Sequence, residues 1–206
     1  MCNNIIDLQV QYYKVLKNFL QVKFHIFFTF VNNNSGEIMF YINFFLFFSI
    51  FGYLFETICS YIFKSGFNSG ILYGPWTPLY GFGVIIIMLL SNKIFESLHL
   101  NKVVETIVVF VVITIVLTVL EWLGGVLIEK LFHITFWDYS NYKYHIGKYI
   151  SLEMSLLWGV GGIILIYLVI PYVCEFIKKI PFFITMFLSS LFIIDVIVTT
   201  INKLKK

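Results

Sequence analysis

The chain has 206 residues, of which 60% are hydrophobic, 20% aromatic and 12% charged, with a formal net charge of +3 and a mean hydropathy of +0.91. This composition excludes an ordinary soluble domain and indicates a chain embedded in a lipid bilayer. The lysines are scattered over the polar stretches without a basic run, so we do not expect a nucleic-acid partner.

The first 36 residues differ from the rest of the chain. Val22–Val31 is apolar but too short to cross a membrane, and Asn32–Gly36 is a polar break. We therefore expect residues 1–36 to form an N-terminal extension with a helix that lies in the membrane interface. Residues 37–203 are expected to form a transmembrane helical domain.

Five later stretches are long and apolar enough to cross a hydrocarbon core, which takes about 20 helical residues. They predict an all-α, polytopic membrane helix bundle in the cell membrane. The five expected spans are Met39–Phe63, Ile71–Ser91, Val103–Ile128, Ile150–Val173 and Pro181–Ile201.

The second expected span is irregular, because glycines and prolines crowd its start between Gly70 and Gly83. A residue before proline avoids the α-helical region, so regular helix should begin near Pro78. A helix from Leu79 to Ser91 reaches only about 20 Å, so either it extends past Lys93 or the preceding segment is non-helical at membrane depth. Such a segment is either a hinge that lines a transport site or a loop that only packs.

Orientation follows from the lysines close to the expected spans. Positive charge near span ends favours the cytoplasmic side. This rule places the N-terminus outside and the C-terminus inside. The lysines that favour this assignment are Lys64, Lys130, Lys143, Lys148, Lys203, Lys205 and Lys206.

Carboxylates gather on one side of the expected bundle. With five spans, the loops around Lys64–Gly70 and Glu129–Tyr149 share a membrane face with the C-terminus, and each carboxylate falls within roughly 10 Å of that face. Acidic side chains at membrane depth are costly and indicate a function or a partner. The six carboxylates are Glu56, Glu121, Glu129, Asp138, Glu153 and Asp195.

Helical spacing predicts which faces pack against protein. Ser49, Gly52, Glu56 and Ser60 form one stripe on the first span. On the third span Glu121, Gly125 and Glu129 repeat at four-residue steps, and on the fourth Ser151, Ser155 and Gly159 do the same. Small residues at this spacing favour close contact between helices.

Two interpretations of the polar residues remain open. In the functional one, Glu56, Glu121 and the glycine- and proline-rich segment form a pocket for a cationic or protonatable group. In the structural one, Glu129 and Asp138 are solvated at the headgroup level, and Glu56 and Glu121 are bonded to Ser, Tyr or Trp. The run from Trp137 to Ser140 is similarly either a binding rim or an interfacial aromatic belt with a turn. The candidate pocket residues are Glu56, Glu121, Glu129, Gly74, Pro75, Pro78, Tyr80, Trp137, Asp138, Tyr139 and Trp158.

Known catalytic and metal-binding patterns are missing from the sequence. His133, Asp138 and His145 lie near Glu129, but neither HExxH nor a pair of histidines at helical spacing occurs. The three cysteines have no metal-type spacing and are expected to be unpaired thiols. We expect no metal, no cofactor and no catalytic residue, although a membrane enzyme remains an alternative.

Three motifs, in order, resemble a family of bacterial membrane proteins called putative ABC-transporter type IV, or CmpB-like, proteins. The resemblance covers about Phe51–Gly162. This family usually has Arg at the positions of Ser69 and Lys148 and Asn at that of His145. This chain therefore has the acidic residues of the family's motifs but lacks the two Arg guanidinium groups that would pair with them. The matching residues are Gly52 and Glu56; Asn68, Gly70, Leu72, Gly74, Pro75, Pro78, Tyr80, Gly81 and Gly83; and Glu121, Gly125, Glu129, Phe132, Trp137, Asp138, Tyr139, Ser140, Gly147, Ile150, Leu152, Ser155, Trp158 and Gly159.

The resemblance implies a multi-pass, permease-like component of a transporter. The chain has no phosphate-binding GxxxxGK[ST] motif, so in an ABC-type system the ATPase would be a separate chain. The alternative is a membrane protein that does not transport, either an enzyme acting on lipid-phase substrates or a scaffold for a partner. Expected partners are the lipid bilayer and either a separate ATPase subunit or further copies of this chain.

Overall fold

The computed structural model describes residues 35–63, 70–90 and 101–205. The chain divides into two units, Met1–Phe40 and Tyr41–Lys206, and the second contains nearly all of the described elements. The expected interfacial helix at Val22–Val31, the loop at Lys64–Ser69 and any helix beyond Leu90 lie outside the described residues.

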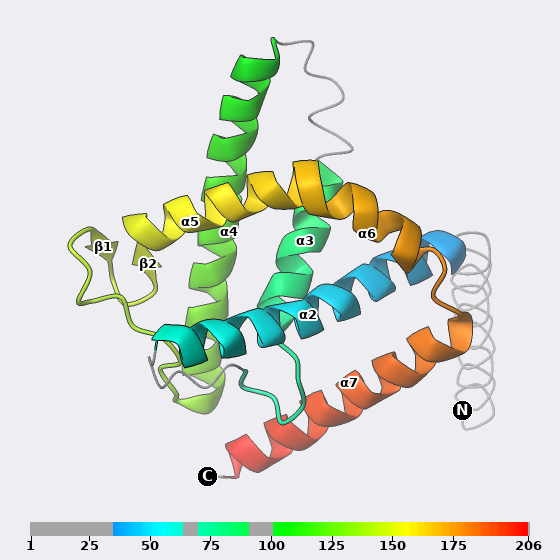
Figure 1. Cartoon of the computed structure of the whole chain (residues 1–206). Helices are drawn as coiled ribbons and strands as arrows, with labels where there is room; N and C mark the ends of the chain where they lie inside the picture. Colours follow the sequence, from blue (N-terminus) through cyan, green and yellow to red (C-terminus); the bar gives the residue numbers. More distant parts are fainter. Residues whose placement is uncertain (1–34, 64–69, 91–100, 206) are drawn as a thin grey trace, which may run out of the picture. The chain divides into compact units, whose positions relative to one another are not determined.

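Helices make up most of the described chain (Figure 1). One two-stranded antiparallel hairpin separates the helices α4 and α5, with His145 opposite Ser151 and Ile146 opposite Ile150. The elements in chain order are α2 (Ser35–Phe63), α3 (Pro78–Leu90), α4 (Lys102–Phe132), β1 (His145–Ile146), β2 (Ile150–Ser151), α5 (Leu152–Ile164), the π-helical turn η2 (Leu165–Val169), α6 (Ile170–Ile177) and α7 (Phe182–Leu204).

Four described helical segments are long and apolar enough to cross a membrane. They correspond to the first, third, fourth and fifth expected spans, and their ends differ from the prediction by a few residues. The shorter α3 has 13 residues, or about 20 Å at 1.5 Å per residue. It begins at Pro78 as expected. The predicted all-α, polytopic fold is confirmed. The four segments are Gly36–Ile62, Val103–Phe132, Leu152–Ile177 and Phe182–Leu204.

Side chains and a left-handed residue fix several helix ends. Asn101 caps α4 by accepting a hydrogen bond from the Val103 N–H (3.1 Å). The same helix ends at His133, whose φ of 55° lies in the left-handed region. Ser151 caps α5 by accepting from the Met154 N–H (3.2 Å). The hairpin is thereby held between two defined helix ends.

The fourth expected span is one helical rod with a wider turn inside it. Pro171 has no N–H and cannot make the regular bond to the carbonyl four residues earlier. The chain accommodates it with the π-helical turn Leu165–Val169, where the Ile170 N–H bonds to the Leu165 carbonyl. A π turn of this kind keeps the helix continuous across the proline.

The apolar core joins α3, α4 and the rod from α5 to α6. It is centred on Ile87, Val109, Ile113 and Leu117. Glycine lets α5 approach α4, because a Cβ at Gly159 would overlap the Thr114 hydroxyl. The predicted small-residue contact on the fourth span is therefore present.

The polar stripe on α2 faces protein, as the spacing predicts. Ser49 and Gly52 are buried, and Glu56 and Ser60 are partly buried. Phe51, Leu54, Phe55 and Ile58 of the same helix are exposed and therefore available to lipid. The stripe consequently turns Glu56 toward α3 and α4.

Candidate functional site

The first carboxylate of the site belongs to α2 and is paired with a tyrosine of α3. The Tyr80 hydroxyl lies beside the Glu56 carboxylate, where it can act as a donor. Its ring lies where a side chain at position 52 would be, because a Cβ at Gly52 would overlap the ring carbons. The glycine one turn before Glu56 thus makes the space that brings Tyr80 to the carboxylate.

The second carboxylate comes from α4 and is almost fully buried. Glu121 is 3% exposed, and its Oε1 accepts a hydrogen bond of 2.7 Å from the Tyr139 hydroxyl. Trp158 of α5 lies beside the same carboxylate, although its buried Nε1 completes no well-aligned hydrogen bond. The Trp158 and Tyr80 rings meet edge to face with centroids 5.3 Å apart.

These contacts bring the two carboxylates to one place. Glu121 acts electrostatically on Glu56, and both carboxylates act on Tyr80. The Oε2 atoms of Glu56 and Glu121 are buried and have no hydrogen-bond partner among the described residues. We call this group, formed by Glu56, Tyr80, Glu121, Tyr139 and Trp158, the carboxylate cluster.

Tyr139 reaches the cluster from the segment between α4 and the hairpin. Burial raises the pKa of Tyr139, and the neighbouring Glu121 carboxylate raises it further. The hydroxyl therefore stays protonated at neutral pH and serves as a donor. The segment is held in turn by a bond from the Tyr139 N–H to the Lys148 carbonyl (2.7 Å).

Glu129 forms a separate ion pair with Lys148 near the hairpin. The Lys148 Nζ lies 2.6 Å from Oε1 of Glu129, and both side chains are partly exposed. The Glu129 carboxylate raises the pKa of Lys148, which favours the charged amine. Lys148 is therefore already engaged outside the carboxylate cluster.

Asp138 occupies an exposed turn. Its Oδ1 accepts a hydrogen bond of 2.8 Å from the Ser140 N–H, and the Ser140 hydroxyl and N–H hold the pKa of this carboxyl below its usual range. This arrangement matches the turn interpretation of the sequence. The neighbouring Trp137 ring meets Tyr149 edge to face at 5.8 Å, and its indole tip lies 3.7 Å from a Cβ built on Gly124.

The glycine- and proline-rich segment before α3 is bound to α7. Asp195 accepts hydrogen bonds from the Tyr73 N–H (3.1 Å), the Gly74 N–H (2.7 Å) and the Thr199 hydroxyl (2.9 Å). A Cβ at Gly74 would lie 2.8 Å from Oδ2 of Asp195, so this approach needs glycine. Asp195 thereby fixes the non-helical segment Gly70–Thr77 beside α7.

Comparison with known proteins identifies a family. A family model described as "Putative ABC-transporter type IV" matches residues 43–201. The chain belongs to this family. No curated protein and no solved structure gives a significant match.

Five of the eleven candidate residues of this family member lie together in the carboxylate cluster. The cluster is compatible with both the functional and the structural interpretation of Glu56 and Glu121. Tyrosine hydroxyls lie beside both carboxylates, as the structural interpretation expects, and the two carboxylates also lie together, as a binding site requires. The remaining six candidates lie elsewhere: Glu129 pairs with Lys148, Asp138 lies in its turn, Trp137 packs on Tyr149, Gly74 contacts Asp195, Pro75 is exposed, and Pro78 begins α3.

The histidines considered for a metal have other contacts in this family member. His133 ends α4, and the His145 Nδ1 donates to the Gly147 carbonyl at 3.0 Å. Lys148 contacts Glu129 through its single amine. Sequence reasoning missed the role of Asp195. Only its pairing with backbone N–H groups about 120 residues earlier reveals that role, and no local pattern in the sequence encodes it.

Proposed function

We propose that this protein is the membrane-embedded, permease-like component of a transporter, and that the carboxylate cluster binds a positively charged group of the transported compound. Membership of the ABC-transporter type IV family supports the first part. The arrangement of Glu56 and Glu121 supports the second.

One observation carries the proposal: two carboxylates from different helices each have a buried Oε2 that meets no donor in the part of the chain that the structure describes. Leaving such an oxygen without a donor costs free energy, of the order of 1–3 kcal/mol for a polar group and more for a charged one. Intramembrane acidic groups of this kind mark substrate or ion pathways. A positive ligand would satisfy both oxygens and balance their charge.

The position of the cluster also suits a transport site. It joins α2, α3, α4 and α5, and α3 follows directly on the non-helical segment Gly70–Thr77. Transporters commonly place their binding sites where an interrupted helix meets its neighbours. A displacement of α3 would separate Tyr80 from Glu56 and open the cluster to one side.

Affinity purification of the tagged full-length protein from its native membrane tests the proposal. Mass spectrometry of the eluate should find an ATPase subunit in a fixed ratio to this chain. The Glu56→Gln variant is the control, because a change inside the cluster should leave a subunit interface intact. An eluate without any ATPase but with a stoichiometric lipid would contradict the proposal and favour a membrane protein that does not transport.

A further inference from the structure

We propose that the carboxylate cluster binds an organic cation through a primary ammonium group. This inference rests on the proposed function of the cluster as a binding site and defines the chemical class of its ligand. Three features of the cluster specify that class: its charge, its unpartnered acceptors and its aromatic rings.

Among the described residues, no positive group balances the charge of the cluster. The described groups that act on Glu56 are Tyr80 and Glu121, and those that act on Glu121 are Tyr139 and Trp158. None of them is a cation. Two carboxylates this close repel each other in a medium of low dielectric constant, so the site favours a ligand that brings positive charge.

The unpartnered carboxylate oxygens of the cluster favour a ligand with N–H groups. Glu121 is 3% exposed, and its Oε2 has no partner among the described residues, although its Oε1 is satisfied by Tyr139. Glu56 has an equally buried and unpartnered Oε2. A primary ammonium has three donors and can bond to both oxygens at once, whereas a quaternary ammonium has none.

The rings of the cluster favour an organic cation over a hydrated inorganic one. Trp158 and Tyr80 meet edge to face at 5.3 Å, and Tyr139 adds a third aromatic residue, which bonds to Glu121 through its hydroxyl. Aromatic faces attract ammonium groups and also pack against their alkyl chains. Hard divalent cations need about six oxygen ligands, and the described residues contain no group of three or more acidic, histidine or cysteine side chains placed to hold a metal.

Thermal unfolding of the purified full-length protein in detergent tests this inference with simple probes. Methylammonium, tetramethylammonium and Na⁺ are compared as chlorides at equal ionic strength and pH 7, where methylammonium is charged as a lysine side chain is. We expect methylammonium to raise Tm by about 2–4 °C more than either of the other cations. An equal rise with Na⁺ or with tetramethylammonium would overturn the inference.

Variants of the cluster locate the effect. Glu56→Gln and Glu121→Gln should each abolish the additional rise in Tm. Glu105→Gln is the matched control on α4, remote from the cluster, and should retain it. A rise that persists in both Gln variants would place the probe elsewhere and refute the inference.

The test of the ammonium site does not depend on the Gln variants alone. If both fail to fold, the difference among the three cations in the unaltered protein still decides whether N–H donors matter. The purification experiment above is independent of this one. Recovery of an ATPase without a methylammonium-specific rise would refute only the ammonium site, and the reverse result would refute only the transporter assignment.

Discussion

Each carboxylate of this chain has its own surroundings, and these surroundings separate the residues that merely hold the fold from those that can bind. Asp138 is held by its own turn, Glu129 by a lysine, and Asp195 by backbone N–H groups. Glu56 and Glu121 combine a neighbouring tyrosine hydroxyl with an oxygen that is buried and has no partner among the described residues. The Glu153 Oε2 is also buried without such a partner, but this residue is not part of the carboxylate cluster. Glu56 and Glu121 are therefore the residues on which a functional change should depend.

Glutamine at either position should abolish function while the protein remains in the membrane. Glu56→Gln and Glu121→Gln keep the shape of the side chain and an acceptor for the tyrosine hydroxyl but remove the charge. Because both carboxylates bind one ligand in the proposed site, the double variant should be no worse than either single one. Rescue of a deletion strain, measured together with membrane abundance, tests this expectation. Full activity in both single variants would contradict it.

Glycines at two contact points should not tolerate alanine. A Cβ at Gly81 would lie 2.6 Å from the Phe45 carbonyl oxygen, a backbone atom that cannot rotate away, and a Cβ at Gly74 would press on Asp195 and Trp76. We expect Gly81→Ala and Gly74→Ala to lower the free energy of unfolding by about 1–3 kcal/mol.

Gly161 provides the control for these two substitutions. It is exposed in α5, and a Cβ there would meet no atom within 4 Å. Gly161→Ala should leave stability unchanged or raise it slightly, because alanine favours helix over glycine. Thermal unfolding in detergent compares the three variants. Equal stability of all three would mean that the close contacts at Gly74 and Gly81 tolerate a side chain.

At the scale of elements, the segment Gly70–Thr77 depends on α7 for its position. The Asp195 carboxylate accepts two backbone N–H groups from it, and the Thr77 N–H bonds to the Ser49 carbonyl of α2 (2.9 Å). In Asp195→Asn one oxygen is replaced by an NH₂ group that cannot accept. We expect faster hydrogen exchange at Tyr73 and Gly74, because one of these amides loses a charged acceptor.

Hydrogen exchange followed by mass spectrometry can resolve this change. The peptide containing residues 70–77 should exchange faster in Asp195→Asn, while peptides from α4 stay unchanged. Glu175→Gln, in an exposed pair with Lys178, is the control and should alter neither. If exchange in residues 70–77 is the same in the Asp195 variant, the carboxylate does not hold the segment.

Sequence patterns predicted the helices well and their long-range contacts poorly. The length of each apolar run and the proline at position 78 define the spans within a few residues, because membrane thickness and proline chemistry act locally. The π-helical turn before Pro171 and the two-residue strands were not predicted, since neither has a periodicity of its own. The stripe on α2 pointed to Glu56, but its pairing with Tyr80 depends on how α3 packs.

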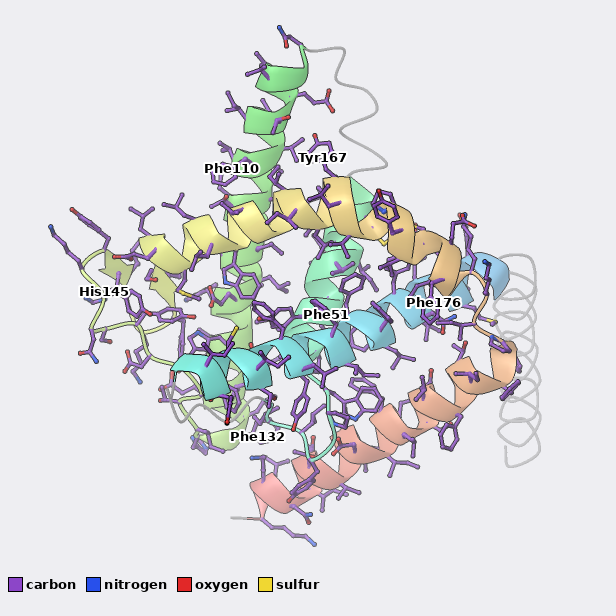
Figure 2. The ribbon with its side chains drawn as sticks, viewed as in Figure 1. Phe51, Phe110, Phe132, His145, Tyr167 and Phe176 are labelled. Carbon is purple, nitrogen blue, oxygen red and sulfur yellow. The ribbon has the colours of Figure 1, made fainter. Side chains whose placement is uncertain are left out.

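At the scale of the whole molecule, two helices indicate how the chain crosses the bilayer. Asn43 near the start of α2 accepts a hydrogen bond of 2.7 Å from the Thr185 hydroxyl near the start of α7, and both residues are buried. From there the two helices run in the same direction (Figure 1). In the side-chain view the ring of Phe176, at the end of α6, lies close to α2 (Figure 2), and its centroid is 5.9 Å from that of Phe47. Because the two helices run in the same direction, the chain crosses the membrane an odd number of times from the start of α2 to the end of α7. The ends of α2 and α7 therefore lie on the same face.

Cysteine labelling tests this topology. In a background without Cys2, Cys59 and Cys174, single cysteines replace exposed residues at Asn141, Lys179 and Lys205. With five crossings and the C-terminus inside, Asn141→Cys and Lys205→Cys should react with a membrane-impermeant maleimide only after the cells are opened.

Lys179→Cys, in the connection between α6 and α7, should react in intact cells and is the control for reagent access. Reaction of Asn141→Cys and Lys205→Cys from opposite sides would mean that the helices between them cross an odd number of times. The hairpin and the C-terminus would then lie on different faces. The carboxylate cluster would remain, because its contacts join α2, α3, α4 and α5, but Asp195 and Glu129 would no longer lie on the same side of the membrane. We expect Asn141 and Lys205 to lie on the same face of the membrane and Lys179 to lie on the opposite face.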